Sequence, residues 1–100
     1  MNDQQAAALL RTMSTRTRLA MLRMLLAEPQ AVAMSLVAAR LGLADGIASQ
    51  NLLILSECGL LIRTCSGVNR FYAPNREMIQ ELLTFLNTLQ GDSHEPRTER

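Results

Sequence analysis

The segment 34–58 contains two helix-forming stretches joined by a turn too short to let them separate. Apolar residues recur at helical spacing over 34–41 and again over 45–58. Gly42 is suited to end the first helix because glycine readily adopts the left-handed backbone found there, and Gly59 follows the second. Two helices joined by a short turn that contains glycine are typical of a helix-turn-helix motif.

The segments around this motif predict a larger fold of the mainly α (α+β) class. The other expected helices cover 3–13, 16–27 and 75–90. Strand-like runs are expected at 60–64 and 70–73. The loop between the runs contains Gly67 and Asn69, which favours a β-hairpin. The sequence therefore predicts a winged helix-turn-helix with five helices and a two-stranded β-hairpin wing.

Composition agrees with a helical core. Aromatic residues make up only 3% of the chain while 48% of its residues are apolar, so Leu, Ala, Met and Ile must fill the core. The 100 residues suffice for one domain, which we expect over 1–90. Residues 91–100 are polar, and we expect them to form a disordered tail.

Charge is distributed unevenly along the chain. The net charge is only +1. Residues 11–76, however, hold eight arginines against three acidic residues, whereas 77–100 hold two arginines against five acidic residues. The positive field therefore belongs to the middle of the chain, where an acidic partner such as DNA would bind.

Several function classes find no support in the sequence. Apolar runs are too short to cross a membrane, and no signal peptide follows Met1, so we expect a cytoplasmic protein. Two cysteines do not make a disulfide scaffold. No His precedes residue 94, no glycine-rich phosphate loop is present, and the only paired carboxylates, Glu77 and Glu81, are expected on a solvated helix face, so we expect neither an enzyme nor a cofactor.

Three segments resemble successive signature segments of the ArsR/SmtB family of bacterial repressors. They read MSTRTRLAMLRMLLAEP, LVAARLGLADGIASQNLLILSECGLL and RTCSGVNRFYAP, and the resemblance covers about residues 5–90. It implies a homodimeric repressor that binds a palindromic operator in double-stranded DNA and leaves it when an inducer binds. The inducer in this family is often a metal ion or metalloid.

DNA contacts are expected from the second helix of the motif and from basic residues around it. Ser49, Gln50 and Asn51 lie near the start of that helix, where such domains read base edges, and amide side chains suit adenine. The helix carries no Lys or Arg, so affinity must come from phosphate contacts of flanking arginines. The candidates are Arg40, Arg63 and Arg70, with Arg16 and Arg18 less certain.

Three charged residues admit other roles. Arg18 is either a phosphate contact or a structural residue paired with a carboxylate such as Glu57. Asp45 favours the macrodipole of the second motif helix and is a candidate to cap it. Glu57 is either solvated or an arginine partner.

The family's usual metal sites are absent from this sequence. The region that matches its Cys-x-Cys site reads Ala33-Met34-Ser35, and the last helix contains no His. Cys58 and Cys65 remain, which is too few for a soft metal unless another ligand joins them. Cys58 is interpreted as a small buried apolar residue, and a thiol- or metalloid-responsive sensor through Cys58 and Cys65 is the alternative.

A dimer is expected because the first and last helices carry more apolar surface than one small core needs. The predicted interface contains Leu9, Leu10, Met13, Leu82, Phe85, Leu86 and Leu89. A different function also fits the uncharged motif helix, namely a winged-helix module that binds another protein and has lost DNA binding.

Overall fold

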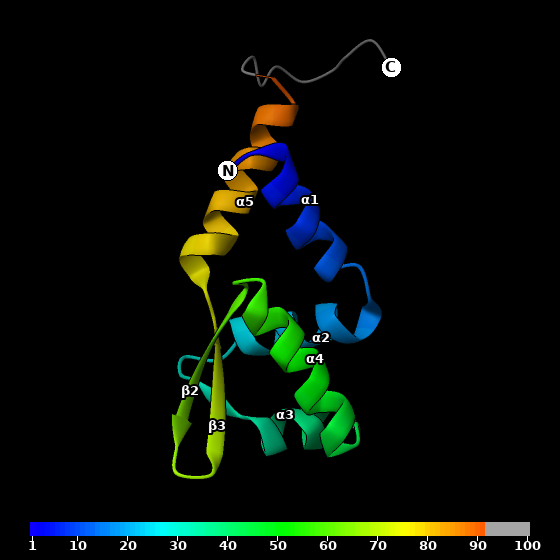
Figure 1. The fold of residues 1–100 in the computed structure, drawn as a ribbon, viewed down its shortest axis with the longest axis vertical. Coiled ribbons are helices and arrows are strands. Elements are labelled where there is room, and N and C mark those ends of the chain that lie inside the picture. Colours follow the sequence, from blue (N-terminus) through cyan, green and yellow to red (C-terminus); the bar gives the residue numbers. More distant parts are fainter. Residues whose placement is uncertain (92–100) are drawn as a thin grey trace.

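The computed structural model describes residues 1–91, so nearly all of the tail expected at 91–100 lies outside the described residues. Eight elements follow one another in the order of Figure 1. The helices are α1 (Asp3–Thr12), α2 (Arg16–Leu26), α3 (Met34–Leu41), α4 (Asp45–Glu57) and α5 (Arg76–Leu89). The strands are β1 (Val32–Ala33), β2 (Leu61–Ser66) and β3 (Asn69–Pro74).

Short polar side chains start three of the helices. The amide oxygen of Asn2 accepts from the backbone N–H of Gln5, whose own side chain accepts from the N–H of Asn2, which forms a capping box. Thr15 and Asn75 cap α2 and α5 in the same way. α3 ends at Gly42, whose φ of 66° is the left-handed conformation expected from the sequence.

The sheet has three strands in the order β1-β3-β2, all antiparallel. The predicted hairpin is confirmed as β2 and β3, and the helix-turn-helix as α3 and α4. The two-residue strand β1 was not predicted, because two residues are too few to show the alternation by which a strand is recognised. Val32 of β1 lies opposite Tyr72 of β3, and both side chains are buried.

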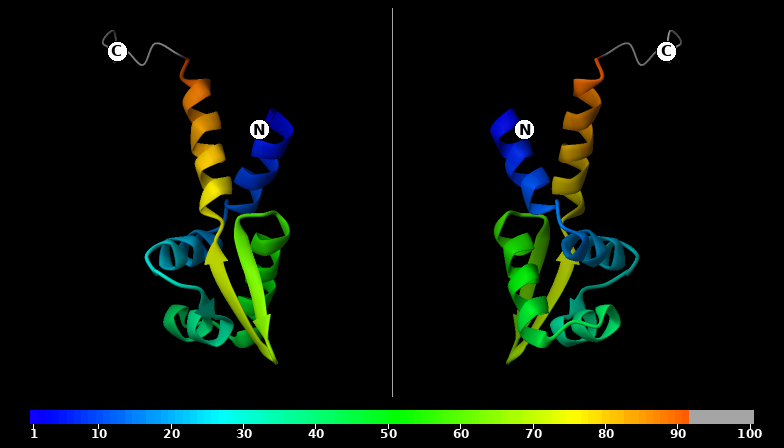
Figure 2. Two further views of the ribbon diagram at one scale, coloured as in Figure 1. Left: turned by 90° about the vertical axis from the view of Figure 1, so that its left-hand side faces the viewer. Right: turned by 90° about the vertical axis from the view of Figure 1, so that its right-hand side faces the viewer.

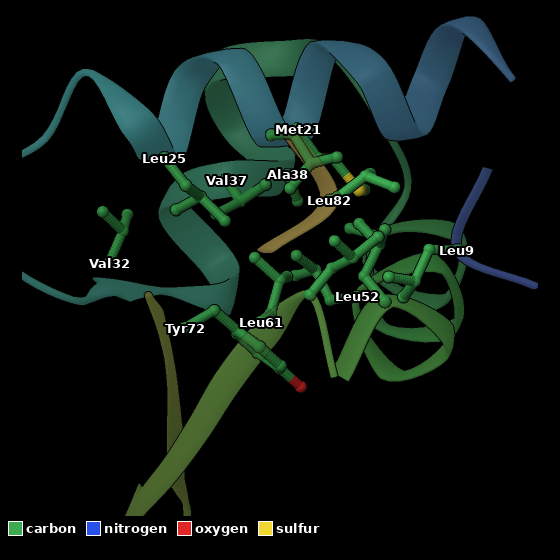
Figure 3. Packing of buried hydrophobic residues seen from close by; sticks show 14 of the residues in the cluster. Leu9, Met21, Leu25, Val32, Val37, Ala38, Leu52, Leu61, Tyr72 and Leu82 are labelled. Carbon is green, nitrogen blue, oxygen red and sulfur yellow. The ribbon is translucent and has the colours of Figure 1, made fainter. Parts of the chain in front are cut away.

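The hydrophobic core lies between the three central helices and one face of this sheet (Figure 3). Met21 and Leu25 come from α2, Val37 from α3, Leu52 from α4 and Tyr72 from β3, and all five are fully buried. Among the described residues no polar or charged side chain is buried. The core thus fixes the positions of α4 and the hairpin.

The molecule is elongated. Its extents are 54 × 24 × 24 Å and its radius of gyration is 15.8 Å, against about 13 Å for a compact 100-residue domain. The reason is visible in Figures 1 and 2, where α1 and α5 extend beyond the body as an arm of two helices that diverge toward its end. The tip of the β2–β3 hairpin and the start of α4 lie at the opposite end. The molecule therefore presents two separate ends.

Candidate nucleic-acid interface

One side of α4 faces solvent. Gly46, Gln50, Leu53 and Glu57 recur at intervals of four and three residues, and all four are exposed. The opposite side carries Ala48, Leu52 and Leu55, which are buried. The helix is therefore anchored along one face and free along the other, as a helix that enters a groove must be.

Gln50 stands at the centre of this exposed face. Its side chain forms no hydrogen bond with any other part of residues 1–91, so its donor and acceptor are both available. Ser49 is half-buried at the edge of the face. Of the three polar residues expected to read bases, Gln50 is the best placed.

Asn51 is engaged within the protein. Its Oδ1 accepts a hydrogen bond from Nε–H of Arg18 at 3.0 Å, and its Nδ2–H donates to the carbonyl oxygen of Ile47 at 2.9 Å. These contacts fix the orientation of the amide and occupy one donor and one acceptor. Asn51 thus links α4 to α2 and keeps one N–H and one lone pair unused, so its contact with a base stays a prediction.

Arg18 has a structural role, but its predicted partner is wrong. Besides Asn51, its Nη1–H donates to the carbonyl oxygen of Thr12 at 3.1 Å, at the end of α1. Within residues 1–91 no ion pair joins Arg18 to Glu57. The guanidinium instead bridges the last residue of α1 to the middle of α4. Arg18 and Asn51 are 33 positions apart, and no local pattern in the sequence indicates that they meet.

Arg40 is exposed at the end of α3, but it is not unpaired. Its Nη1 lies 2.9 Å from Oε2 of Glu28. Exposed ion pairs contribute only about 0–1 kcal/mol, because water screens both charges. A phosphate could therefore displace Glu28, although the carboxylate would oppose its approach.

Arg63 and Arg70 lie on the same face of the hairpin. In the register of β2 and β3, Arg63 is opposite Tyr72 and Cys65 is opposite Arg70. Side chains opposite one another share a face, as do residues two apart on one strand, so both arginines are on the face of Tyr72. The two residues are diagonal neighbours across the strands, a relation in which Cα atoms are roughly 7–8 Å apart. Both arginines are exposed. The hairpin thus carries two adjacent cations.

The start of α4 differs in one respect from expectation. Ala44 is the N-cap, and no side chain caps the helix, so Asp45 does not serve as a cap. Asp45 occupies the first turn, where its charge favours the macrodipole. Arg16 is exposed in the first turn of α2, where no acidic residue accompanies it.

The two cysteines are in different settings. Cys58 is half-buried against the core, and its thiol donates to the carbonyl oxygen of Leu55 at 3.3 Å. Cys65 is exposed on the hairpin. Within the described part of the chain both are free thiols, and no three His, Cys, Asp or Glu side chains cluster as metal ligands would. The geometry adds no third ligand to either thiol.

The predicted dimer surface divides into two groups. Leu82 (4% exposed) and Leu9 are already buried in the chain's own core, so they are corrected from interface to core residues. Met13, Phe85 and Leu86 are half-buried against that core, whereas Leu10 and Leu89 (66%) are exposed. A groove of about 260 Å³ runs between α1 and α5 and is lined in part by Leu10, Phe85 and Leu89.

Leu83, another apolar residue of the last helix, is also exposed on α5. In addition, none of the helices described here is long and apolar enough to span a bilayer.

Solved structures with the same arrangement are transcriptional regulators. A crystal structure of an ArsR-family transcriptional regulator superposes with a TM-score of 0.77 over 90% of this chain and 91% of its own, at 19% identity. HlyU from Vibrio cholerae gives 0.71 over 92% and 100%, at 26% identity. A homodimeric winged helix-turn-helix DNA-binding domain from Mycobacterium bovis, a possible ArsR-family regulator, gives 0.69 over 100% and 96%, at 21% identity.

The chain has the winged helix-turn-helix fold of the ArsR-family regulators. The predicted resemblance and the predicted fold class are thereby confirmed. No family model matches the sequence, and no curated protein matches it either. The solved structures share this fold with the chain at 19–26% sequence identity.

Proposed function

We propose that the chain is an ArsR-family transcriptional repressor that binds double-stranded DNA as a homodimer and acts in the cytoplasm. The observation that carries the proposal is that the start of α4 and the tip of the hairpin lie at the same end of the molecule (Figure 1). Gln50 on α4 offers an exposed amide, and Arg63 and Arg70 are exposed on one face of the hairpin.

Gln50 and the two arginines have different roles in DNA binding. Gln50 is suited to a bidentate contact with adenine in the major groove, whereas the arginines neutralise phosphates without regard to sequence. Because α4 has no basic residue and carries Asp45 and Glu57, affinity depends on the hairpin. Binding should therefore be modest and should fall steeply with salt.

The arm of α1 and α5 supports a dimer. It leaves Leu10, Leu83 and Leu89 exposed at the end opposite to α4. A second copy that covers these residues through a two-fold axis would set two copies of α4 about one DNA turn, ~34 Å, apart, as a palindromic operator requires. The Mycobacterium bovis domain with this fold is described as homodimeric, which agrees with the proposal.

A mobility-shift assay over a salt series on the DNA upstream of the coding sequence tests these roles. Gln50→Ala should cost about 1–3 kcal/mol at one base position and relax the choice of base there. Arg70→Ala should weaken every sequence about equally and lower the salt slope by about one unit per half-site. Equal loss of base discrimination in both variants would contradict the assignment.

The lack of basic residues on α4 supports one other function, a module that binds a protein through this face. The same assay separates the two, because such a module would bind no DNA sequence better than random DNA at any salt concentration. A thiol-responsive sensor through Cys58 and Cys65 would show a different signature, namely release of DNA by oxidants or arsenite.

A further inference from the structure

Two exposed aliphatic side chains flank Gln50 on α4. Ile47 is 48% exposed and Leu53 is 36% exposed, and neither belongs to the hydrophobic core. At 3.6 residues per turn, each lies about 60° around the helix from Gln50, on opposite sides. The polar centre of the exposed face is therefore bordered by apolar groups on both sides.

Packing in the core does not account for the parts of Ile47 and Leu53 that remain exposed. The exposed positions of a surface helix are usually polar, and an aliphatic side chain left in water contributes nothing to the stability of the fold. Ile47 also has a lower helix propensity than Ala or Glu because its χ1 rotation is restricted. Both residues are nevertheless found on the face that the proposed function turns toward DNA.

The major groove offers one apolar group of matching size. Thymine carries a C5-methyl group there, and no other base does. An amide side chain such as that of Gln50 recognises adenine, and adenine pairs with thymine. An aliphatic contact with the thymine methyl group would therefore select the same A·T base pairs that Gln50 selects through adenine. Charge agrees with this, because α4 has no cation with which to read guanine.

We propose that Ile47 and Leu53 read the C5-methyl groups of thymines, so that the half-site is rich in A·T pairs where α4 enters the groove. The inference rests on the proposed function, since it names the DNA sequence class that the same site selects. Specificity then comes largely from apolar contact on either side of one amide, and affinity comes from the hairpin arginines.

The test changes the DNA rather than the protein. The preferred half-site is first selected from random duplex DNA, and each thymine in it is then replaced by deoxyuridine, which pairs identically but lacks the methyl group. Burying one methyl group is equivalent to about a fourfold change in affinity. We expect a loss of about three- to fivefold at one or two thymines and no loss at the others.

Variants identify the side chain that makes each contact. Each of the variants Ile47→Ala and Leu53→Ala should lose the discrimination at one of these thymine positions. At that position the variant should bind the thymine duplex and the deoxyuridine duplex with equal affinity. Leu26→Ala is the matched control, since Leu26 is similarly exposed (37%) but lies at the end of α2; it should retain the discrimination. Circular dichroism checks that each variant is folded.

Three results would overturn the inference, and they are distinguishable. If the wild-type protein binds a specific duplex and deoxyuridine changes nothing, thymine methyl groups are not read, although the proposed function stands. If selection enriches no sequence at all, the proposed function fails as well. A G·C-rich selected half-site would also refute the inference.

Discussion

The bridge between Arg18 and Asn51 allows a quantitative test of how α4 is held. Arg18 joins α2 to α4 and to the end of α1, because its guanidinium donates to Asn51 on α4 and to the Thr12 carbonyl at the end of α1. Asn51→Ala removes the acceptor on α4. Arg18→Met keeps most of the apolar stem and removes both donors.

The expected magnitude follows from the charge and from partial burial. A hydrogen bond from a charged donor contributes about 1.5–3 kcal/mol when it is well shielded. Both residues are only half-buried, and water replaces part of the lost contact, so we expect Asn51→Ala to lower the free energy of unfolding by about 1 kcal/mol. Arg18→Met, which loses two bonds, should cost about 2 kcal/mol.

A double-mutant cycle by urea denaturation measures the interaction itself. If the two side chains act through one bond, the double variant should be less destabilised than the sum of the single variants by about 0.5–1 kcal/mol. Thr12→Ala is the control, because the backbone carbonyl that accepts from Arg18 is kept. Protein concentration is held constant throughout, since a dimer makes stability depend on it.

DNA binding then separates positioning from readout. A positioning role predicts that Asn51→Ala weakens binding to all base variants of a half-site by a similar factor. A coupling energy near zero, together with loss of discrimination at a single base pair, would refute the reasoning and identify Asn51 as a base reader.

Further predictions concern other parts of the molecule. Leu89→Glu should dissociate the dimer in sedimentation at micromolar concentration and leave the fold intact, and a dimer as stable as that of the wild type would exclude this surface. Leu82→Ala should instead lower the free energy of unfolding by about 2–5 kcal/mol, because it opens a cavity in the core. Glu28→Gln should strengthen DNA binding at low salt, since it frees a guanidinium beside the motif; unchanged affinity would show that this guanidinium does not face DNA. Gly46→Ala should not lower the thermal midpoint, because a Cβ there meets no atom within 4 Å, yet it should weaken DNA binding if the start of α4 approaches the DNA backbone closely. Cys58→Ala should respond to oxidants and arsenite as wild type does, and a response that disappears in the variant would identify Cys58 as a sensor.

The helices could be predicted because the relevant information is local. Each of the five has an apolar pattern of about 3.6 residues and, in most cases, a nearby residue that starts or stops it, such as Thr15 or Gly42. The hairpin was evident for the same reason. β1 was not, since a two-residue strand exists only because β3 lies beside it.

The candidate site was only partly predictable. The sequence indicates that Gln50 lies near the start of a motif helix, but not that Asn51 beside it is already bound to Arg18. It indicates two arginines in the hairpin, but not that the register sets them on one face. It indicates excess apolar residues in the last helix, but not that Leu82 is already buried while Leu83 and Leu89 are exposed.

The sequence by itself therefore determined the order and type of the helices, the helix-turn-helix, the hairpin and the absence of basic residues from α4. These follow from the spacing of side chains along one element, which depends on neighbours within a few positions. Only the tertiary structure decided which side chains of α4 remain free and which leucines belong to the core. Those outcomes depend on contacts between residues far apart in the chain, such as the 33 positions that separate Arg18 from Asn51, and no local pattern records them.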